Sequence, residues 1–301
     1  MTELHDEASP MNPLAFSTLG APGWSLQEVA DWAVQHGFSG VELRAAAGEP
    51  VHAGLTPMER RDARALLADA GVHPLAIASY VTVADPATDD GPVIAAGIAH
   101  GVLASDLGAE FLRIFPGGPA VSSKPSDAAN DTAHDTAHDV INDAADAAAI
   151  RRLRAIQLGL ADTSVTVALE THDSHSGGRD VARILHQCPG VAAIWDILHT
   201  WRAGETPAQT VTALGKALAY VQVKDVASRE DLAPLIPGAG ILPLNSVANA
   251  LRANQYHGYV SWEYEKAWCA SAPALTDLGV DVARRLRGVF TGRVAPDHAA
   301  D

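Results

Sequence analysis

Four apolar, strand-like runs in the second half of the chain each end at a residue with a side-chain oxygen, and the regular spacing of these residues restricts the fold. Glu170 follows VTVAL, Asp196 follows AAIW, Gln222 follows LAYV and Glu263 follows YVSW. Successive members of this series are separated by 26, 26 and 41 residues. A strand, a helix and their two loops take roughly 30 residues in a barrel of repeating βα units. The spacing therefore predicts successive parallel strands whose carboxyl ends bring the four side chains together.

The alternation of strand and helix extends over the whole chain. Further strands are expected at residues 14–18, 40–44, 73–81 and 110–115. Helices are expected at residues 25–37, 56–71, 94–107, 140–160, 178–187, 245–253 and 277–287, and after Thr206. Ser25, Thr56 and Thr206 are each followed three residues later by Glu or Gln, the pattern of a capping box. Eight strands alternating with eight helices predict an α/β protein, a (β/α)8 TIM barrel, in a single domain.

Composition separates this domain from its extensions. Residues 1–12 are polar and acidic and are expected to form a flexible N-terminal tail. Residues 13–290 are expected to form the TIM-barrel domain, and residues 291–301 a C-terminal tail. Within the domain, residues 119–139 contain the near repeat DTAHDTAHD, which indicates a low-complexity insertion.

The charge of the chain restricts its partners. It carries 21 Lys and Arg residues against 36 Asp and Glu residues, a formal net charge of −15. This charge disfavours nucleic acid and anionic membranes, so a small neutral or weakly charged molecule is the expected partner, and a homo-oligomer is left open. The N-terminus shows no apolar signal core, no apolar run is long enough to cross a membrane, and only two cysteines occur. These features predict a cytoplasmic protein.

Carboxylates at the strand ends indicate a metal site. In (β/α)8 barrels the carboxyl ends of the strands form the active face. Three carboxylates converging there repel one another unless a cation lies between them or one of them is protonated. Three carboxylates and one amide oxygen are hard ligands, which favour Mn²⁺ or Mg²⁺ and can also bind Co²⁺ or Zn²⁺. The alternative is a structural network in which the same acids pair with Lys and Arg.

Five motifs carry a resemblance to a known family: VALETH, WDILHTW, YVQVKD, PGAG and GYVSWEYEKAW. With them the sequence resembles the xylose isomerase-like TIM-barrel family, the superfamily of sugar phosphate isomerases and epimerases. The resemblance implies one divalent metal ion with the ligands Glu170, Asp196, Gln222 and Glu263. It also places Asp196 and His199 in the family's DxxH pattern. Many members have His where this chain has Gln222, and the hydroxypyruvate isomerase branch resembles this chain in having Gln.

The resemblance also implies a reaction. A metal-dependent sugar isomerase or epimerase is expected, using proton transfer through a metal-stabilised enediolate. Glu170 and Glu263 would exchange the proton, and His199 would donate to a substrate oxygen. The first alternative is a lyase on the same scaffold, such as an inosose or keto acid dehydratase, or an enzyme that eliminates the aglycone of a 3-keto-glycoside. The second alternative is a sugar-binding barrel without catalysis.

Residues around the motifs are candidates for substrate contact. They are His172, Trp201, Lys224 and Trp268, with the weaker candidates Arg113, Glu42 and His52. The alternative for Lys224 is a salt bridge at the rim of the barrel. The tryptophans could equally pack in the core, and His172 could serve a loop or a helix cap.

Overall fold

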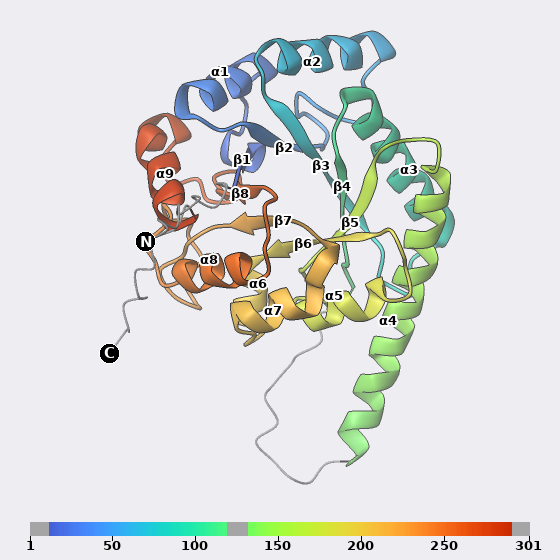
Figure 1. Ribbon diagram of the computed structural model, residues 1–301. Helices are drawn as coiled ribbons and strands as arrows, with labels where there is room; N and C mark the ends of the chain where they lie inside the picture. Colours follow the sequence, from blue (N-terminus) through green and yellow to red (C-terminus); the bar gives the residue numbers. More distant parts are fainter. Residues whose placement is uncertain (1–11, 119–131, 291–301) are drawn as a thin grey trace, which may run out of the picture.

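Eight parallel strands close into a barrel in the computed structural model, which describes residues 12–118 and 132–290 (Figure 1). The strands are β1 Leu14–Ser17, β2 Gly40–Arg44, β3 His73–Thr82, β4 Phe111–Phe115, β5 Thr166–Glu170, β6 Ala192–Asp196, β7 Leu218–Val223 and β8 Val260–Trp262. They pair in sequence order, and β8 returns to β1, where Ala15 lies opposite Ser261. The predicted single-domain TIM barrel is therefore confirmed. The predicted tails, apart from Asn12, and most of the insertion lie outside the described residues.

Helices surround the barrel (Figure 1). They are α1 Leu26–His36, α2 Pro57–Asp69, α3 Asp90–Leu107, α4 Thr132–Gly159, α5 Gly178–Leu185, α6 Ile197–Arg202, α7 Pro207–Leu214, α8 Leu244–Ala253 and α9 Leu275–Phe290. The capping boxes of Ser25, Thr56 and Thr206 are present, so α1, α2 and α7 begin where the sequence predicts. Within the described part of the chain, no helix combines the length and the apolar character needed to cross a membrane.

α3 begins at Asp90, four residues before the predicted start, and two other helices differ more from the expectation. α4 begins at Thr132 rather than near residue 140, so part of the predicted insertion is helical, in keeping with the high helix propensity of its alanines. The sequence patterns do not predict α6 at all. It begins because Oδ1 of Asp196 accepts hydrogen bonds from the backbone N–H groups of Leu198 at 2.8 Å and His199 at 3.4 Å. Asp196 is thus an N-cap as well as a strand-end acid.

The interior of the barrel is filled by side chains below the carboxyl ends of the strands. The buried residues of this interior layer are Ala15, Leu75, Ala76, Phe111, Ala168, Ile194 and Tyr220. The alanines leave room for the rings of Phe111 and Tyr220, whose centroids lie 5.7 Å apart. Trp195 and Trp262 belong instead to the core between the sheet and the helices. The polar strand ends therefore lie above a packed layer and do not surround an open pore.

Candidate metal centre

The alternation of side chains along β5, β6 and β7 points the strand-end residues into the barrel. Residues two apart in a strand face the same side of the sheet. The interior layer contains the residues two positions before Glu170, Asp196 and Gln222, so these three side chains point inward directly above that layer. Glu263 follows the last residue of β8 and lies beside them.

Three of these residues form a buried group of carboxylates. Glu170, Asp196 and Glu263 are 1%, 0% and 3% exposed, and each offers an oxygen within 4.8 Å of the others. Gln222 is fully buried beside them, with Nε2 3.3 Å from Oε1 of Glu263. The structure thus brings all four predicted metal ligands together, and we call these four residues the strand-end cluster.

Lys224 continues the alternation two residues after Gln222 and lies against the strand-end cluster. Its side chain is buried, and Nζ is within 2.8 Å of a carboxylate oxygen of each of three residues: Asp196, Glu263 and Glu265. Burial disfavours the charged ammonium, but the three carboxylates raise the pKa of Lys224 well above its ordinary value. The ion pairs neutralise part of the negative charge of the site.

Arg113 and Glu42 extend the site to the first half of the barrel. The buried Arg113 guanidinium lies 3.4 Å from an oxygen of Glu170 and 3.4 Å from an oxygen of Glu42. Glu42 is fully buried and accepts hydrogen bonds from Nε2 of Gln222 at 3.0 Å and from Oγ of Ser261 at 3.3 Å. The strand-end cluster and its neighbours therefore contain five carboxylates against two cations, an excess of three negative charges when all are ionised.

The buried acids of the site differ in pKa. Burial raises the pKa of Glu170 to about 8 and the pKa of Glu42 to about 7, and neighbouring carboxylates add to the effect. Burial also opposes ionisation of Asp196, but the nearby ammonium of Lys224 holds the pKa of this carboxyl at about 2. Protonation of the two glutamates is one way to relieve the excess negative charge, and a divalent cation is the other.

Unsatisfied oxygens in the strand-end cluster fit a hard divalent cation. Oε1 of Gln222 and Oε2 of Glu170 are buried and accept no hydrogen bond from the described residues, and Oε2 of Glu170 has an ion pair with Arg113 at 3.4 Å. Buried polar atoms normally have such partners. The donor atoms of the cluster are carboxylate and amide oxygens, which suit Mg²⁺ and Mn²⁺. The residues present therefore fit one divalent metal ion.

His199 and His172 lie at the edge of the strand-end cluster with their rings in contact. The ring centroids are 3.9 Å apart, and Nε2 of His199 is 3.7 Å from Oδ2 of Asp196. Nδ1 of His172 is 2.8 Å from Asp173, and its ring centroid is 4.6 Å from that of Phe115. Burial and neighbouring positive charges lower the pKa of His199 to about 4, so this ring is neutral near pH 7. A neutral imidazole keeps one N–H group that can donate to a substrate oxygen.

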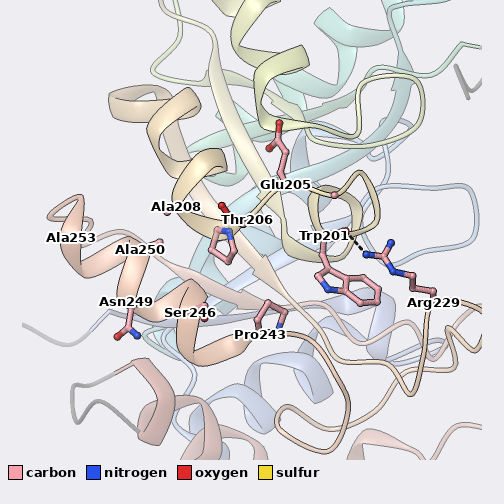
Figure 2. Close-up of a pocket in the computed structure, with 12 residues that line it drawn as sticks. Trp201, Glu205, Thr206, Ala208, Arg229, Pro243, Ser246, Asn249, Ala250 and Ala253 are labelled. Carbon is pink, nitrogen blue, oxygen red and sulfur yellow. Dashed lines mark hydrogen bonds between the residues drawn. The ribbon is translucent and has the colours of Figure 1, made fainter. Parts of the chain in front are cut away.

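The two tryptophans predicted to contact substrate lie outside the strand-end cluster. Trp201 on α6 lines a cavity of about 700 Å³ between α7 and α8, where the Arg229 guanidinium lies 4.1 Å from the centroid of its ring (Figure 2). No residue of the strand-end cluster lines this cavity. Trp268, between β8 and α9, is 60% exposed, and the Arg44 guanidinium lies 4.8 Å from the centroid of its ring.

Glu42 lies closer to the strand-end cluster than its sequence context indicates. No motif surrounds it, so the sequence marks it only as a weak pocket candidate. In the structure it contacts Gln222, Ser261 and Arg113. The signal that could have found it is a carboxylate within a short apolar strand, because a fully buried acid is rare without a partner. His52, another weak candidate, makes none of these contacts.

These features define a class of protein, a (β/α)8 barrel with a buried cluster of oxygen ligands at the carboxyl ends of its strands. The family model described as Xylose isomerase-like TIM barrel matches residues 30–286. The chain belongs to this family. A search of curated protein sequences gives no significant match.

Solved structures share the fold at low sequence identity. The probable 3-DHS dehydratase AsbF of Bacillus anthracis is 17% identical, with a TM-score of 0.68 over 93% of this chain and 99% of that chain. A D-psicose 3-epimerase, solved in the presence of D-fructose, is 15% identical, with a TM-score of 0.71 over 93% and 100%. The IOLI protein, solved with a zinc atom, is 14% identical, with a TM-score of 0.72 over 93% and 100%. At these identities the likeness establishes the fold alone.

Proposed function

We propose that this protein is a divalent-metal-dependent isomerase or epimerase that acts on a neutral sugar or sugar derivative. The observation that carries the proposal is the strand-end cluster, whose unsatisfied oxygens fit one hard cation and whose charge exceeds that of its Lys and Arg neighbours. Membership of the xylose isomerase-like family and the structural similarity to a D-psicose 3-epimerase support it.

The proposed reaction moves a proton between carbon positions next to a carbonyl group. A bound Mn²⁺ or Mg²⁺ ion would supply positive charge that stabilises negative charge developing on the substrate oxygens. Glu170, from β5, removes the proton from one face of the substrate, and Glu263, after β8, delivers a proton from the other face, with the roles exchanged in the reverse direction. The neutral ring of His199 donates a hydrogen bond to the substrate oxygen, which favours the enediolate over the ketone.

A substrate without phosphate suits the charges around the site. Lys224 and Arg113 are held by the carboxylates described above, and Arg44 at the end of β2 pairs with Glu49 at 2.5 Å. A phosphate group would have to compete with carboxylates for these cations. We therefore propose an unphosphorylated substrate.

Aromatic side chains are proposed to bind the carbon face of the substrate. The exposed ring of Trp268 and the half-buried ring of His172 are suited to the C–H faces of a sugar. Trp201 has the same proposed role only for a substrate group that reaches the cavity of Figure 2.

A lyase is the second candidate, and the structural similarity to a probable dehydratase favours it. Such an enzyme would begin with the same proton removal by Glu170 or Glu263 and would then expel a leaving group from the neighbouring carbon. A sugar-binding barrel without catalysis would bind the metal and the sugar and exchange no proton.

Hydrogen exchange in heavy water tests the proposed function. The metal-stripped protein and the Mg²⁺-loaded protein are incubated with ketoses, inososes and 3-keto-glycosides, and the products are followed by NMR. We expect metal-dependent replacement of a C–H beside the carbonyl by C–D. Glu170→Gln and Glu263→Gln should each slow this exchange at least about 100-fold. Glu110→Gln, the same change at an exposed residue before β4, is the control.

The product separates the candidates. An isomeric sugar identifies an isomerase or epimerase, whereas loss of water or of an aglycone identifies a lyase. Metal binding without exchange in any member of the panel favours the binding protein. A protein that binds no divalent ion contradicts the proposal as a whole.

A further inference from the structure

Glu42 is surrounded by hydrogen-bond donors inside the barrel. Its carboxylate is fully buried on β2, and Nε2 of Gln222 lies 3.0 Å from one of its oxygens and 3.3 Å from the other. Oγ of Ser261 donates to it at 3.3 Å, and Nη1 of Arg113 lies at 3.4 Å. An ionised carboxylate only accepts hydrogen bonds, so these contacts match the ionised form.

This arrangement decides which end of the Gln222 amide faces away from Glu42. The amide nitrogen donates hydrogen bonds, and the amide oxygen accepts them. Nε2 faces both oxygens of Glu42 and lies 3.3 Å from Oε1 of Glu263. With the amide reversed, its oxygen would face these three carboxylate oxygens and every one of the hydrogen bonds would be lost. Oε1 is therefore on the other side of the amide, buried and without a hydrogen-bond partner among the described residues.

We propose that Glu42 is a positioning residue of the metal site, which holds the Gln222 amide so that its oxygen is offered to the cation. This inference rests on the proposed metal-dependent function. Mn²⁺ and Mg²⁺ bind oxygen ligands, so only one of the two orientations of the amide supplies a ligand. Groups that orient a metal ligand typically change metal affinity by about 10- to 100-fold.

Glu42 could also act through its charge alone. A negative charge near the site attracts a cation whatever the orientation of Gln222. The two effects differ in one respect, because orientation requires an amide at position 222 and attraction does not. A double-mutant cycle between Glu42 and Gln222 therefore separates them.

The experiment measures Mn²⁺ binding to the metal-stripped protein at pH 8, by calorimetry and by the EPR signal of free Mn²⁺, and requires no substrate. Glu42→Gln should weaken binding about 10- to 100-fold, because a second amide can pair with Gln222 in either orientation. Gln222→Ala should weaken binding by a similar factor. In the Gln222→Ala background, Glu42→Gln should add less than about threefold.

Ser261→Ala is the matched control, because it removes a different donor to Glu42 and leaves Gln222 in place. It should bind Mn²⁺ within about threefold of the wild type. Circular dichroism and thermal unfolding establish that each variant is folded. If Glu42→Gln does not fold, Glu42→Asp replaces it. The shorter carboxylate keeps the charge but withdraws from Gln222, so binding should again weaken.

Two results would overturn the inference. If Glu42→Gln lowers the Mn²⁺ affinity by the same factor in the wild-type and Gln222→Ala backgrounds, Glu42 acts through its charge alone. Unchanged Mn²⁺ binding in Glu42→Gln would show that Glu42 has no role in metal binding. Failure of the wild-type protein to bind Mn²⁺ or Mg²⁺ is a different outcome, because it overturns the proposed function together with the inference.

Discussion

Lys224 joins three carboxylates through one buried ammonium group. Nζ lies 2.8 Å from Asp196, 2.5 Å from Glu263 and 2.6 Å from Glu265. Forming a buried ion pair gains little net free energy, because both charges leave water, but removing one partner leaves the other charge buried and uncompensated. The stability of the metal-free protein is therefore expected to depend on this residue.

Lys224→Met should lower the free energy of unfolding of the metal-free protein by about 3–5 kcal/mol. Mn²⁺ should restore more stability to this variant than it adds to the wild type, because the ion neutralises the same carboxylates. Urea unfolding with and without Mn²⁺ measures both effects, and Lys216→Met, at an exposed position, is the control. Identical unfolding midpoints of the variant and the metal-free wild type would show that these ion pairs do not support the fold.

Residues with local signals could be predicted from the sequence, and residues with distant partners could not. Glu170 and Asp196 follow short apolar runs at the interval of a βα unit, and both properties are visible in a few dozen residues. Glu42 has its partners Gln222 and Ser261 at sequence separations of 180 and 219 residues. These groups meet only because the barrel closes, so the local pattern of an acid in a short apolar strand marks Glu42 as a candidate but does not identify its partners.

At the scale of elements, a buried histidine joins α4 to the loop after β5. Nε2 of His175 lies 2.7 Å from Asp146 on α4, and Nδ1 lies 2.8 Å from Ser174. Arg183 on α5 donates to the same Asp146 carboxylate. His172 and His175 exchange two backbone hydrogen bonds across the turn between them. These contacts hold the loop that carries His172 at the edge of the strand-end cluster.

Asp146→Asn should destabilise the protein by about 1–3 kcal/mol near pH 7, because His175 and Arg183 lose a charged acceptor. Burial would raise the pKa of Asp146, but the hydrogen bonds from His175 and Arg183 keep it below the ordinary value of 3.8. A carboxylate with a lowered pKa stabilises the folded state above its unfolded-state value and loses this contribution as the pH falls through its folded-state value. The difference in stability between wild type and variant should therefore shrink below about pH 4.

Urea unfolding at a series of pH values from neutral to acidic measures this difference. Asp143→Asn is the control, because it makes the same change at an exposed position of the same helix. A difference that grows as the pH falls would contradict the assigned sign.

The helices mark a limit of prediction from sequence. The capping boxes of Ser25, Thr56 and Thr206 are complete within four residues, and they place the starts of α1, α2 and α7. α6 has no such signal, because β6 ends at Asp196 and α6 begins at Ile197 with no loop between them. Asp196 ends β6 and also caps α6. The sequence therefore shows the end of a strand here, and it shows no separate signal for the start of the helix.

At the scale of the whole molecule, the two halves of the barrel supply different parts of the site. The strand-end cluster comes from β5 to β8, whereas Glu42 and Arg113 come from β2 and β4 (Figure 1). Closure of the barrel between β8 and β1 brings Glu42 into contact with Gln222 and Ser261. A cation at the site would therefore bind only the folded barrel, and its binding would stabilise the domain as a unit.

Mn²⁺ should raise the melting temperature of the wild-type protein, and a chelator should reverse the effect. An ion at 100 times its Kd adds about 2.7 kcal/mol to the stability of a folded state that alone binds it. For a domain of this size, this corresponds to an increase of roughly 4–5 °C. Thermal unfolding followed by circular dichroism measures it.

Asp196→Asn should lose most of this increase, since it removes a carboxylate from the strand-end cluster. Asp31→Asn, at an exposed position on α1, is the control. An equal increase in Asp196→Asn and wild type would place the ion elsewhere on this acidic chain, whose net charge is −15.

The two oxygens of Asp196 have different partners, and this restricts how the sequence can evolve. Oδ1 accepts the backbone N–H groups that start α6, while Oδ2 faces Lys224 at 2.8 Å. Asparagine would keep the helix start and give up the charge, whereas glutamate would keep the charge and cap the helix poorly. Either exchange loses one of the two properties. Descendants of this chain can vary in their loops, but we expect those that keep the proposed metal site to keep aspartate at position 196.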